Sequence, residues 1–326
     1  MRICLYYRTI DKPWGGANSF IVNLRNFFMK NDVEITTDIN SQYDVLFLNG
    51  AYKAPGKMFD LSSIRAIKRY GYASFIKRIF GQKRKVKIVY RLDGLRKIYA
   101  GVNSKMDTIQ LQCLPYADHI IFQSKFAHQI FSDAGYNGNN FSVIHNGVNT
   151  NMFNIAGRDF WDGKYPLKIV ACSWSANPAK GHAIIARYAD VEGVEVHYVG
   201  KWPQNISSGK VICHGPLPQR EIAEIFKQSH VFLFPALQEA CSNTLLEALA
   251  CGLPVLYIDS GSNREIAGEY GIELREESFE RSITYMREQY GLLRARIENE
   301  NKKFSIGCVG EKYLEICQKL CHGSDS

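Results

Sequence analysis

The segment Val231-Phe-Leu-Phe-Pro-Ala-Leu-Gln-Glu-Ala-Cys-Ser-Asn-Thr-Leu-Leu-Glu-Ala-Leu-Ala-Cys-Gly252 joins a strand-like apolar run to a helix that stops at the final glycine. Two carboxylates, Glu239 and Glu247, bracket the strand-to-helix turn. A helix N-terminus offers free backbone N–H groups and the positive end of a dipole, which suit phosphate. Carboxylates accept hydrogen bonds from hydroxyls. The segment therefore predicts a ligand with both phosphates and neighbouring hydroxyls, as in a nucleotide sugar.

In this interpretation Ser242, Asn243 and Thr244 present amides and hydroxyls to a diphosphate, while the glutamates hold ribose on one side and hexose on the other. An alternative is a capping box over Thr244-Leu-Leu-Glu247, with Thr244 as the N-cap and Glu247 reaching back to its amide. Capping does not explain Glu239, which lies just beyond the strand end, where open α/β sheets bind ligands. The pair of glutamates therefore favours a binding role.

Length and composition set the broad class of the protein. A chain of 326 residues exceeds the usual size of a single core, so we expect two domains. Nine cysteines without a C-x-x-C pair indicate a reducing compartment. The N-terminus does not resemble a signal peptide, and the longest apolar stretch, 245–258, is too short and too interrupted to span a bilayer. We expect a cytoplasmic protein, soluble or peripheral at the inner membrane face.

The net charge of +8 is concentrated in one region, 64–97. Apolar residues interleave with the charges there, as on an amphipathic helix that lies on an anionic membrane. An ordinary solvated helix with its apolar stripe toward the core gives the same pattern, and both interpretations stay open. No nucleic-acid-binding motif accompanies the charge, so nucleic acid is not an expected partner. The basic residues are Arg65, Lys68, Arg69, Lys77, Arg78, Lys83, Arg84, Lys85, Lys87, Arg91, Arg96 and Lys97.

Strand-like runs alternate with helical patterns along both halves of the chain. This alternation predicts two doubly wound units with parallel sheets, joined within 153–166. No G-x-G-x-x-G fingerprint or Walker loop is present, but Gly15 and Gly16 occupy a strand-to-helix turn where the backbone could approach a phosphate or sugar. A plain tight turn explains them equally well. The runs are 2–7, 43–49, 86–92, 119–123, 141–145, 167–172, 194–199, 210–213, 231–235 and 254–258.

Together with the opening segment, four further motifs carry a family resemblance: Ala117-Asp-His-Ile-Ile-Phe-Gln-Ser124, Val143-Ile-His-Asn-Gly-Val-Asn149 through Phe153, Lys180-Gly181, and His214-Gly-Pro-Leu-Pro-Gln-Arg-Glu-Ile222. The chain resembles the retaining glycosyltransferases of family 4. The resemblance implies the GT-B fold, which is α/β, with two facing Rossmann-like doubly wound domains and a cleft between them. The expected domains are 1–156 for the acceptor, 157–303 for the nucleotide sugar, and a helix within 304–326 that packs back on the first.

The resemblance assigns the donor sugar to Glu239 and the ribose to Glu247. Lys180 follows a strand and its turn, where an ammonium could neutralise a leaving diphosphate, although a plain surface lysine is the alternative. Relatives often pair this lysine with an arginine a few residues earlier. In this chain the corresponding segment, 173–177, contains no arginine. The expected catalytic residues are Glu239, Lys180 and Asp93. The expected donor-binding residues are Gly15, Gly16, Ser175, Asn177, Lys180, Pro216, Leu217, Glu239, Ala240, Cys241, Ser242, Asn243, Thr244 and Glu247.

The stretch Tyr90-Arg-Leu-Asp-Gly94 contains two candidate site residues of the first domain, Asp93 and Arg91. Relatives place a histidine or aspartate near the reacting sugar in the region of Asp93, whereas a turn-forming Asp-Gly is the alternative. Arg91 is a weaker candidate, since an inward strand arginine could bind an acceptor phosphate or a structural carboxylate.

The implied reaction is transfer of a hexose from a nucleoside-diphosphate sugar to a glycan or lipid-linked acceptor, with retention, in surface polysaccharide or glycoconjugate synthesis. No cofactor is expected, and the absence of an Asp-x-Asp motif is consistent with metal-independent catalysis. Two alternatives share the architecture. One is a non-catalytic binding or partner subunit, and the other is a sugar epimerase or phosphorylase.

Overall fold

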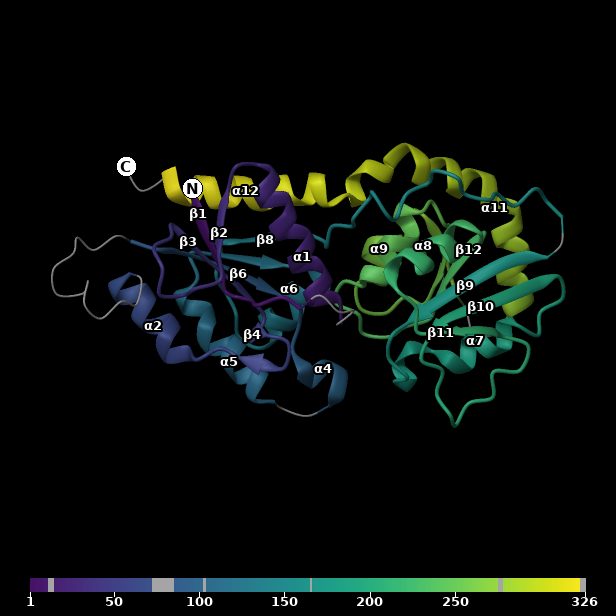
Figure 1. Ribbon diagram of the computed structural model, residues 1–326. Helices are drawn as coiled ribbons and strands as arrows, with labels where there is room; N and C mark the ends of the chain where they lie inside the picture. Colours follow the sequence, from purple (N-terminus) through teal and green to yellow (C-terminus); the bar gives the residue numbers. More distant parts are fainter. Residues whose placement is uncertain (11–14, 72–84, 102–103, 165, 275–277, 323–326) are drawn as a thin grey trace. The chain divides into compact units, whose positions relative to one another are not determined.

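The computed structural model describes residues 1–10, 15–71, 85–101, 104–164, 166–274 and 278–322. The chain divides into two compact units, each with its own sheet (Figure 1). The first unit comprises Met1–Gly147 and Ile306–Ser326, and the second comprises Val148–Ser305. No described helix is long and apolar enough to cross a membrane.

The first unit is built on a sheet with the strand order β2-β1-β3-β6-β7-β8, in which all neighbouring strands are parallel. A small antiparallel extension, β4 and β5, is attached to β3. The order reverses at β1, because β2 and β3 lie on opposite sides of it. The strands are β1 (Arg2–Leu5), β2 (Glu34–Thr36), β3 (Val45–Asn49), β4 (Tyr52–Ala54), β5 (Lys57–Met58), β6 (Lys87–Leu92), β7 (His119–Phe122) and β8 (Phe141–Val143).

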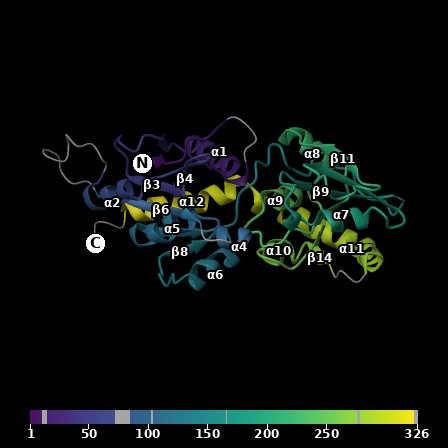
Figure 2. The ribbon, with the colours of Figure 1, turned by 90° about the horizontal axis from the view of Figure 1, so that it is seen from below.

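Helices cover both faces of this sheet (Figures 1 and 2). The first helix and the C-terminal helix pack against each other, and together with the strands they form one apolar core. Gly310 allows their close approach, since a Cβ there would overlap the ring of Phe27. The helices are α1 (Gly15–Lys30), α2 (Leu61–Tyr70), α4 (Arg96–Ala100), α5 (Lys105–Cys113), α6 (Lys125–Asp133) and α12 (Ile306–His322), with a 3-10 turn at Leu114–Tyr116.

The second unit has a fully parallel sheet with the order β11-β10-β9-β12-β13-β14. Near-continuous apolar runs form its central strands, as expected for a sheet buried on both faces. The chain proceeds from β9 to β11 in one direction and then crosses to the other side of β9. The strands are β9 (Leu167–Ser173), β10 (Val194–Gly200), β11 (Ile212–Gly215), β12 (Val231–Phe234), β13 (Val255–Tyr257) and β14 (Gly271–Glu273).

Two apolar cores flank the second sheet, one on each face. The first joins it to α8 and α9, and the second joins it to α7 and α11. The prediction of two parallel α/β units is confirmed. The helices are α7 (His182–Tyr188), α8 (Gln219–Lys227), α9 (Asn243–Ala250), α10 (Asn263–Ala267) and α11 (Phe279–Glu300), with 3-10 turns at Pro178–Lys180 and Asn301–Phe304.

The basic region 64–97 contains both helix and strand. Ile64 and Ile67 of α2 are fully buried, so the described part of its apolar stripe faces the core and is not free to enter a membrane. Arg91, counted with the basic surface in the sequence, lies inside β6 with 1% of its surface exposed. The other interleaved apolar residues fall in 72–84, outside the described residues.

A buried arginine anchors the entry into the second unit. Arg158 donates to the carbonyl oxygen of Gly252, to that of His230 at 3.1 Å and to the hydroxyl of Tyr290 at 3.1 Å. It thereby joins the segment before β9 to the turn after α9, to the start of β12 and to α11. Burial lowers the pKa of its guanidinium, and the three acceptors compensate for the lost hydration.

Arg158→Ala is expected to lower the free energy of unfolding by about 3 kcal/mol, because three buried acceptors lose their donor and a cavity forms. Urea unfolding at 25 °C measures the change. Arg281→Ala, at an exposed position on α11, is the matched control and should shift stability by less than about 0.5 kcal/mol. Equal effects of the two substitutions would contradict the anchoring role.

Candidate active site

The loop after β9 ends in a turn that holds Lys180. Asn177 accepts a hydrogen bond from the backbone N–H of Ala179 at 3.0 Å and so caps this 3-10 turn. Gly181 follows with a φ of 73°, and a Cβ there would lie 2.7 Å from the ring of Pro235. Only glycine tolerates both conditions. The β9 loop therefore packs directly on the loop after β12.

These two loops bring Lys180 and Glu239 together. The backbone N–H of Leu237 donates to the carbonyl oxygen of Ala179 at 2.8 Å, which fixes the loops side by side. The ammonium of Lys180 forms an ion pair with Oε1 of Glu239. Their side chains are 28% and 20% exposed, so both groups can be reached from solvent. The sequence predicted each residue separately, whereas the ion pair emerges only from the structure.

The backbone around Glu239 is held in an unusual conformation. Gln238 has a φ of 58°, which is rare for a residue with a side chain, and its N–H donates to the hydroxyl of Ser260 at 2.9 Å. The carbonyl oxygen of Glu239 accepts from the N–H of Ser262 at 2.8 Å. A Cβ on Gly261 would lie 2.5 Å from that same carbonyl oxygen. Such strain costs about 1–3 kcal/mol and is typical of functional sites.

Sequence reasoning missed this supporting loop after β13. Its signal was present, because Ser-Gly-Ser at 260–262 follows the apolar run 254–258 at the carboxyl end of a strand. Asn263 continues the loop into α10 and is fully buried. Its side-chain amide donates to the carbonyl oxygens of Ala236 and Ile258 at 2.8 and 2.9 Å. The loops after β12 and β13 are thus joined, and both support Glu239.

The N-cap of α9 is Ser242, and the capping box centred on Thr244 is wrong. Ser242 accepts from the N–H of Leu245 at 3.4 Å, and its hydroxyl is 2.9 Å from that of Thr244. The helix begins two residues earlier than a Thr244 cap requires, because the serine hydroxyl already satisfies the free amide. Glu247 is therefore a helix-interior residue and not a cap partner.

Glu247 is buried, and no charged side chain in the described ranges pairs with it. Only 8% of its surface is exposed, and within the described parts of the chain no side chain or amide donates a hydrogen bond to its carboxyl group. Burial raises the pKa of this carboxyl from 4.5 to about 7. A ligand hydroxyl that donates to the carboxylate would supply the missing hydrogen bond.

The other predicted donor-binding residues of the second unit differ in their accessibility. Ser175 is exposed, and its hydroxyl accepts from the N–H of Asn177 at 3.2 Å, so it organises the β9 loop. Ala240 and Cys241 are 6% and 8% exposed and would offer backbone groups only. These residues share the edge between β9 and β12 with Lys180 and Glu239.

Pro216 and Leu217 follow β11 and lie farther along the same edge of the sheet, since β10 separates β11 from β9. Pro216 is exposed, whereas Leu217 packs partly against the core of α8 and α9. Beside them, the imidazoles of His197 and His214 stack with nitrogen atoms 2.9 Å apart. This pair was not predicted.

In the first unit, Asp93 lies at the carboxyl end of β6. Burial raises the pKa of its carboxyl group, and the charge of nearby Arg91 opposes that shift. Arg91 donates to the side-chain oxygens of Asn49 and of Asn146, the latter at 2.6 Å, and lies 4.1 Å from the ring centroid of Phe20. Among the described residues Arg91 forms no ion pair with a carboxylate, so the structural carboxylate considered from the sequence is absent.

Gly15 and Gly16 begin α1, and Gly15 has a φ of 59°. A Cβ on Gly15 would meet no atom of the described residues within 4 Å. The preceding residues 11–14 lie outside the described chain. Among the described residues, no group of three or more histidine, cysteine, aspartate or glutamate side chains could hold a metal ion.

Residues 179–288 match the family model of glycosyl transferases group 1. No curated protein matches the chain. The matched range includes Lys180, Glu239 and Glu247, the residues that the structure gathers at one edge of the second sheet.

Several solved structures share the fold over nearly their whole length. Sucrose-phosphate synthase from Thermosynechococcus elongatus is 14% identical with a TM-score of 0.68, and 99% of each chain is covered. Anabaena HepE, solved with UDP, is 16% identical with a TM-score of 0.68, covering 98% of this chain and 100% of HepE. AviGT4, a glycosyltransferase of avilamycin A biosynthesis, is 11% identical with a TM-score of 0.64, covering 99% and 98%. The shared architecture is GT-B.

The carboxyl group of Glu247 predicts a specific pH dependence of stability. Its folded pKa of about 7 exceeds the ordinary 4.5, so the folded state holds the proton more tightly. The contribution of this group is therefore fully present below pH 4.5 and is lost as the pH rises toward 7, by about 3 kcal/mol. Glu247→Gln should remove this loss.

Urea unfolding of both proteins at pH 5 and pH 8 measures the difference. The variant is expected to gain stability relative to wild type at the higher pH, while the pH response of all other groups cancels in the comparison. If the stability of both proteins changed equally between pH 5 and pH 8, the pKa of Glu247 would not be raised and its carboxyl group would be hydrated.

Proposed function

We propose that this chain is a glycosyltransferase, which moves a hexose from a nucleoside-diphosphate sugar to a hydroxyl of a glycan or lipid-linked acceptor with retention of configuration. The match of residues 179–288 to the family model of glycosyl transferases group 1 supports this proposal. The observation that carries the proposal is the Lys180–Glu239 ion pair. It lies where the strand order reverses between β9 and β12, the place at which open α/β sheets bind ligands.

The diphosphate is assigned to Lys180 and the amino end of α9. An incoming phosphate is a stronger partner for the ammonium than a single carboxylate, because it carries more charge and more acceptor oxygens. The amides at the start of α9 add donors and the positive end of the helix dipole. As the glycosidic bond breaks, charge develops on the leaving diphosphate, and the same groups stabilise it without help from a metal ion.

The sugar and the ribose are assigned to the two glutamates. Once phosphate engages Lys180, the carboxylate of Glu239 is released to accept hydrogen bonds from hexose hydroxyls. Its position is fixed by the strained turn at Gln238 and the contacts with Ser262. The carboxylate of Glu247 would accept a hydrogen bond from a ribose hydroxyl. This bond would compensate for its burial, since no described group donates to it. This arrangement gives each part of a nucleotide sugar its own partner.

Structures with the same fold suggest which donor to try first. HepE has been solved with UDP-glucose, and a pneumococcal O-GlcNAc transferase of similar fold has been solved with UDP and GlcNAc. UDP-glucose and UDP-GlcNAc are therefore the first candidates. In the first unit we propose that Asp93 acts near the reacting sugar and that the backbone of Gly15 and Gly16 approaches the donor.

We propose synthesis of a surface polysaccharide or glycoconjugate in the cytoplasm, with peripheral contact to an anionic membrane through 64–97. Charge supports the membrane contact, since the last turn of α2 carries Lys68 and Arg69 and β6 is preceded by Lys85. The burial of Ile64 and Ile67 leaves the described part of the contact electrostatic.

Glu239→Ala is expected to leave the fold intact and to reduce transfer, measured as kcat/KM for release of the nucleoside diphosphate, by about 100-fold or more. The reason is loss of the hydrogen bonds that orient the sugar. Binding of the nucleotide sugar should weaken more than binding of the corresponding nucleoside diphosphate, which lacks the hexose. Calorimetric titration compares the two ligands.

Glu269→Ala, at an exposed position in the second unit, is the matched control. Near-normal turnover of Glu239→Ala would overturn the assignment of this residue. Selective donor binding without release or transfer in the wild type would identify a binding subunit in place of an enzyme.

A further inference from the structure

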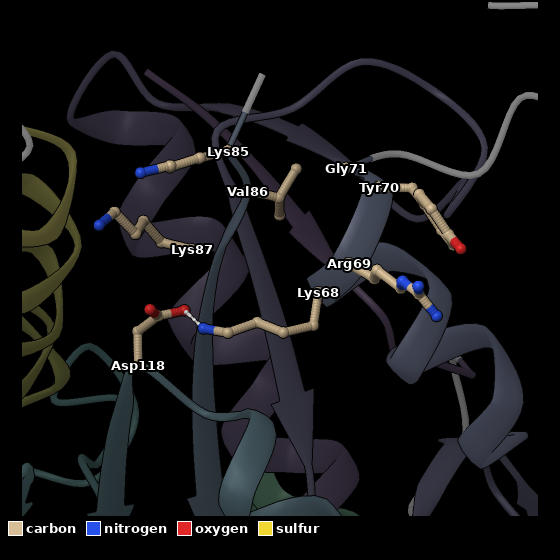
Figure 3. Close-up of a pocket in the computed structure, with 8 residues that line it drawn as sticks. All are labelled: Lys68, Arg69, Tyr70, Gly71, Lys85, Val86, Lys87 and Asp118. Atoms are coloured by element: carbon tan, nitrogen blue, oxygen red, sulfur yellow. Dashed lines mark ion pairs between the residues drawn. The ribbon is translucent and has the colours of Figure 1, made fainter. Parts of the chain in front are cut away.

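A pocket lies in the first unit, at the amino ends of β6 and β7 (Figure 3). It is bounded by the end of α2 on one side and by the start of β6 on the other, and its volume is about 320 Å³. The residues assigned to catalysis lie after strand ends, at the opposite edge of their sheets. This pocket therefore belongs to neither the donor site nor the Asp93 region. It is lined by Lys68, Arg69, Tyr70, Gly71, Lys85, Val86, Lys87 and Asp118.

The cationic residues of the pocket come from two elements, the end of α2 and the start of β6. Lys85 and Lys87 are two residues apart on extended chain, so their side chains project to the same side, as Figure 3 shows. Between them Val86 turns inward and is 5% exposed. Lys68 extends from α2 toward Asp118 below them. Arg69 points to the other side of the pocket, with its guanidinium carbon 5.2 Å from the ring centroid of Tyr70.

Positive charge in this pocket exceeds negative charge by a wide margin. The lining contributes four cationic side chains and one carboxylate, and that carboxylate is already paired with Lys68. Oδ2 of Asp118 lies 2.7 Å from the ammonium of Lys68 and accepts from the N–H of Ile88 at 2.8 Å. Within the described chain, neither Lys85 nor Lys87 forms an ion pair. Clustered cations in a concave site repel one another and attract anions.

We propose that this pocket binds a phosphate group. A phosphate offers several acceptor oxygens and up to two negative charges, which match the ammonium groups of Lys85 and Lys87 while Lys68 stays anchored to Asp118. A single carboxylate would neutralise only one of them. The phosphate belongs either to a lipid headgroup or to a free phosphate ion. The inference is independent of the transferase proposal, because it concerns a different edge of a different unit.

The test compares a pocket variant, Lys85→Gln with Lys87→Gln, with a control, Lys312→Gln with Lys319→Gln, which removes two exposed lysines from α12 of the same unit. Inorganic phosphate is titrated by calorimetry into each protein. The pocket variant should bind it about tenfold more weakly or worse, with the control unchanged. Residual binding at the diphosphate site is common to all three proteins and does not obscure the difference.

Co-sedimentation with vesicles then distinguishes the two sources. The vesicles contain phosphatidylcholine with either phosphatidic acid or phosphatidylserine at equal surface charge. A preference for phosphatidic acid that the pocket variant loses identifies a lipid headgroup, whereas loss of inorganic phosphate binding alone identifies the free ion. Equal losses in the pocket and control variants, or none in either, would overturn the proposal. Thermal melting and nucleotide-sugar binding, both expected to be unchanged, show that the pocket variant is folded and that the donor site is intact.

Discussion

The close approach of two loops at Gly181 and Pro235 is the constraint on which the second unit's site depends. Parallel strands β9 and β12 are neighbours although the chain passes through β10 and β11 between them. Their carboxyl ends therefore deliver two loops from distant parts of the sequence to one place. Because Gly181 has no side chain, the loops touch, and Lys180 reaches Glu239. A side chain at this position would separate the ammonium from the carboxylate.

The electrostatic character of the site follows from that contact. Lys180 and Glu239 neutralise each other and remain partly hydrated, so the pair is a ready partner for a ligand with both anionic and hydroxyl groups. Glu247, one helical turn inside α9, is buried and has no such partner among the residues that the structure describes. The two carboxylates thus differ in environment, which suits them to different parts of one ligand. The strained backbone at Gln238 is tolerated because the β13 loop holds Glu239 on its other side.

Much of this architecture could be predicted from the sequence, because buried parallel strands are near-continuous apolar runs whose signal is local. The short strands β2, β4, β5 and β14 were missed, since two or three residues carry little pattern. Ser242 and Thr244 are both residue types that favour the N-cap position. Only the backbone conformation in the structure shows that Ser242 is the N-cap. The support of Glu239 by Ser260 and Ser262 depends on tertiary contacts. The apolar stripe that contains Ile64 and Ile67 has the same periodicity whether it faces a membrane or a core. Only the burial of these side chains in the structure shows that it faces the core.

Lys180 is expected to hold a diphosphate that displaces Glu239 from its ammonium. Calorimetric titration of a nucleoside diphosphate into wild type, Lys180→Met, Glu239→Gln and the double variant measures this competition. Lys180→Met should weaken binding about tenfold or more, Glu239→Gln should bind at least as tightly as wild type, and the double variant should behave like Lys180→Met. Equal affinities in all four proteins would show that the diphosphate binds elsewhere.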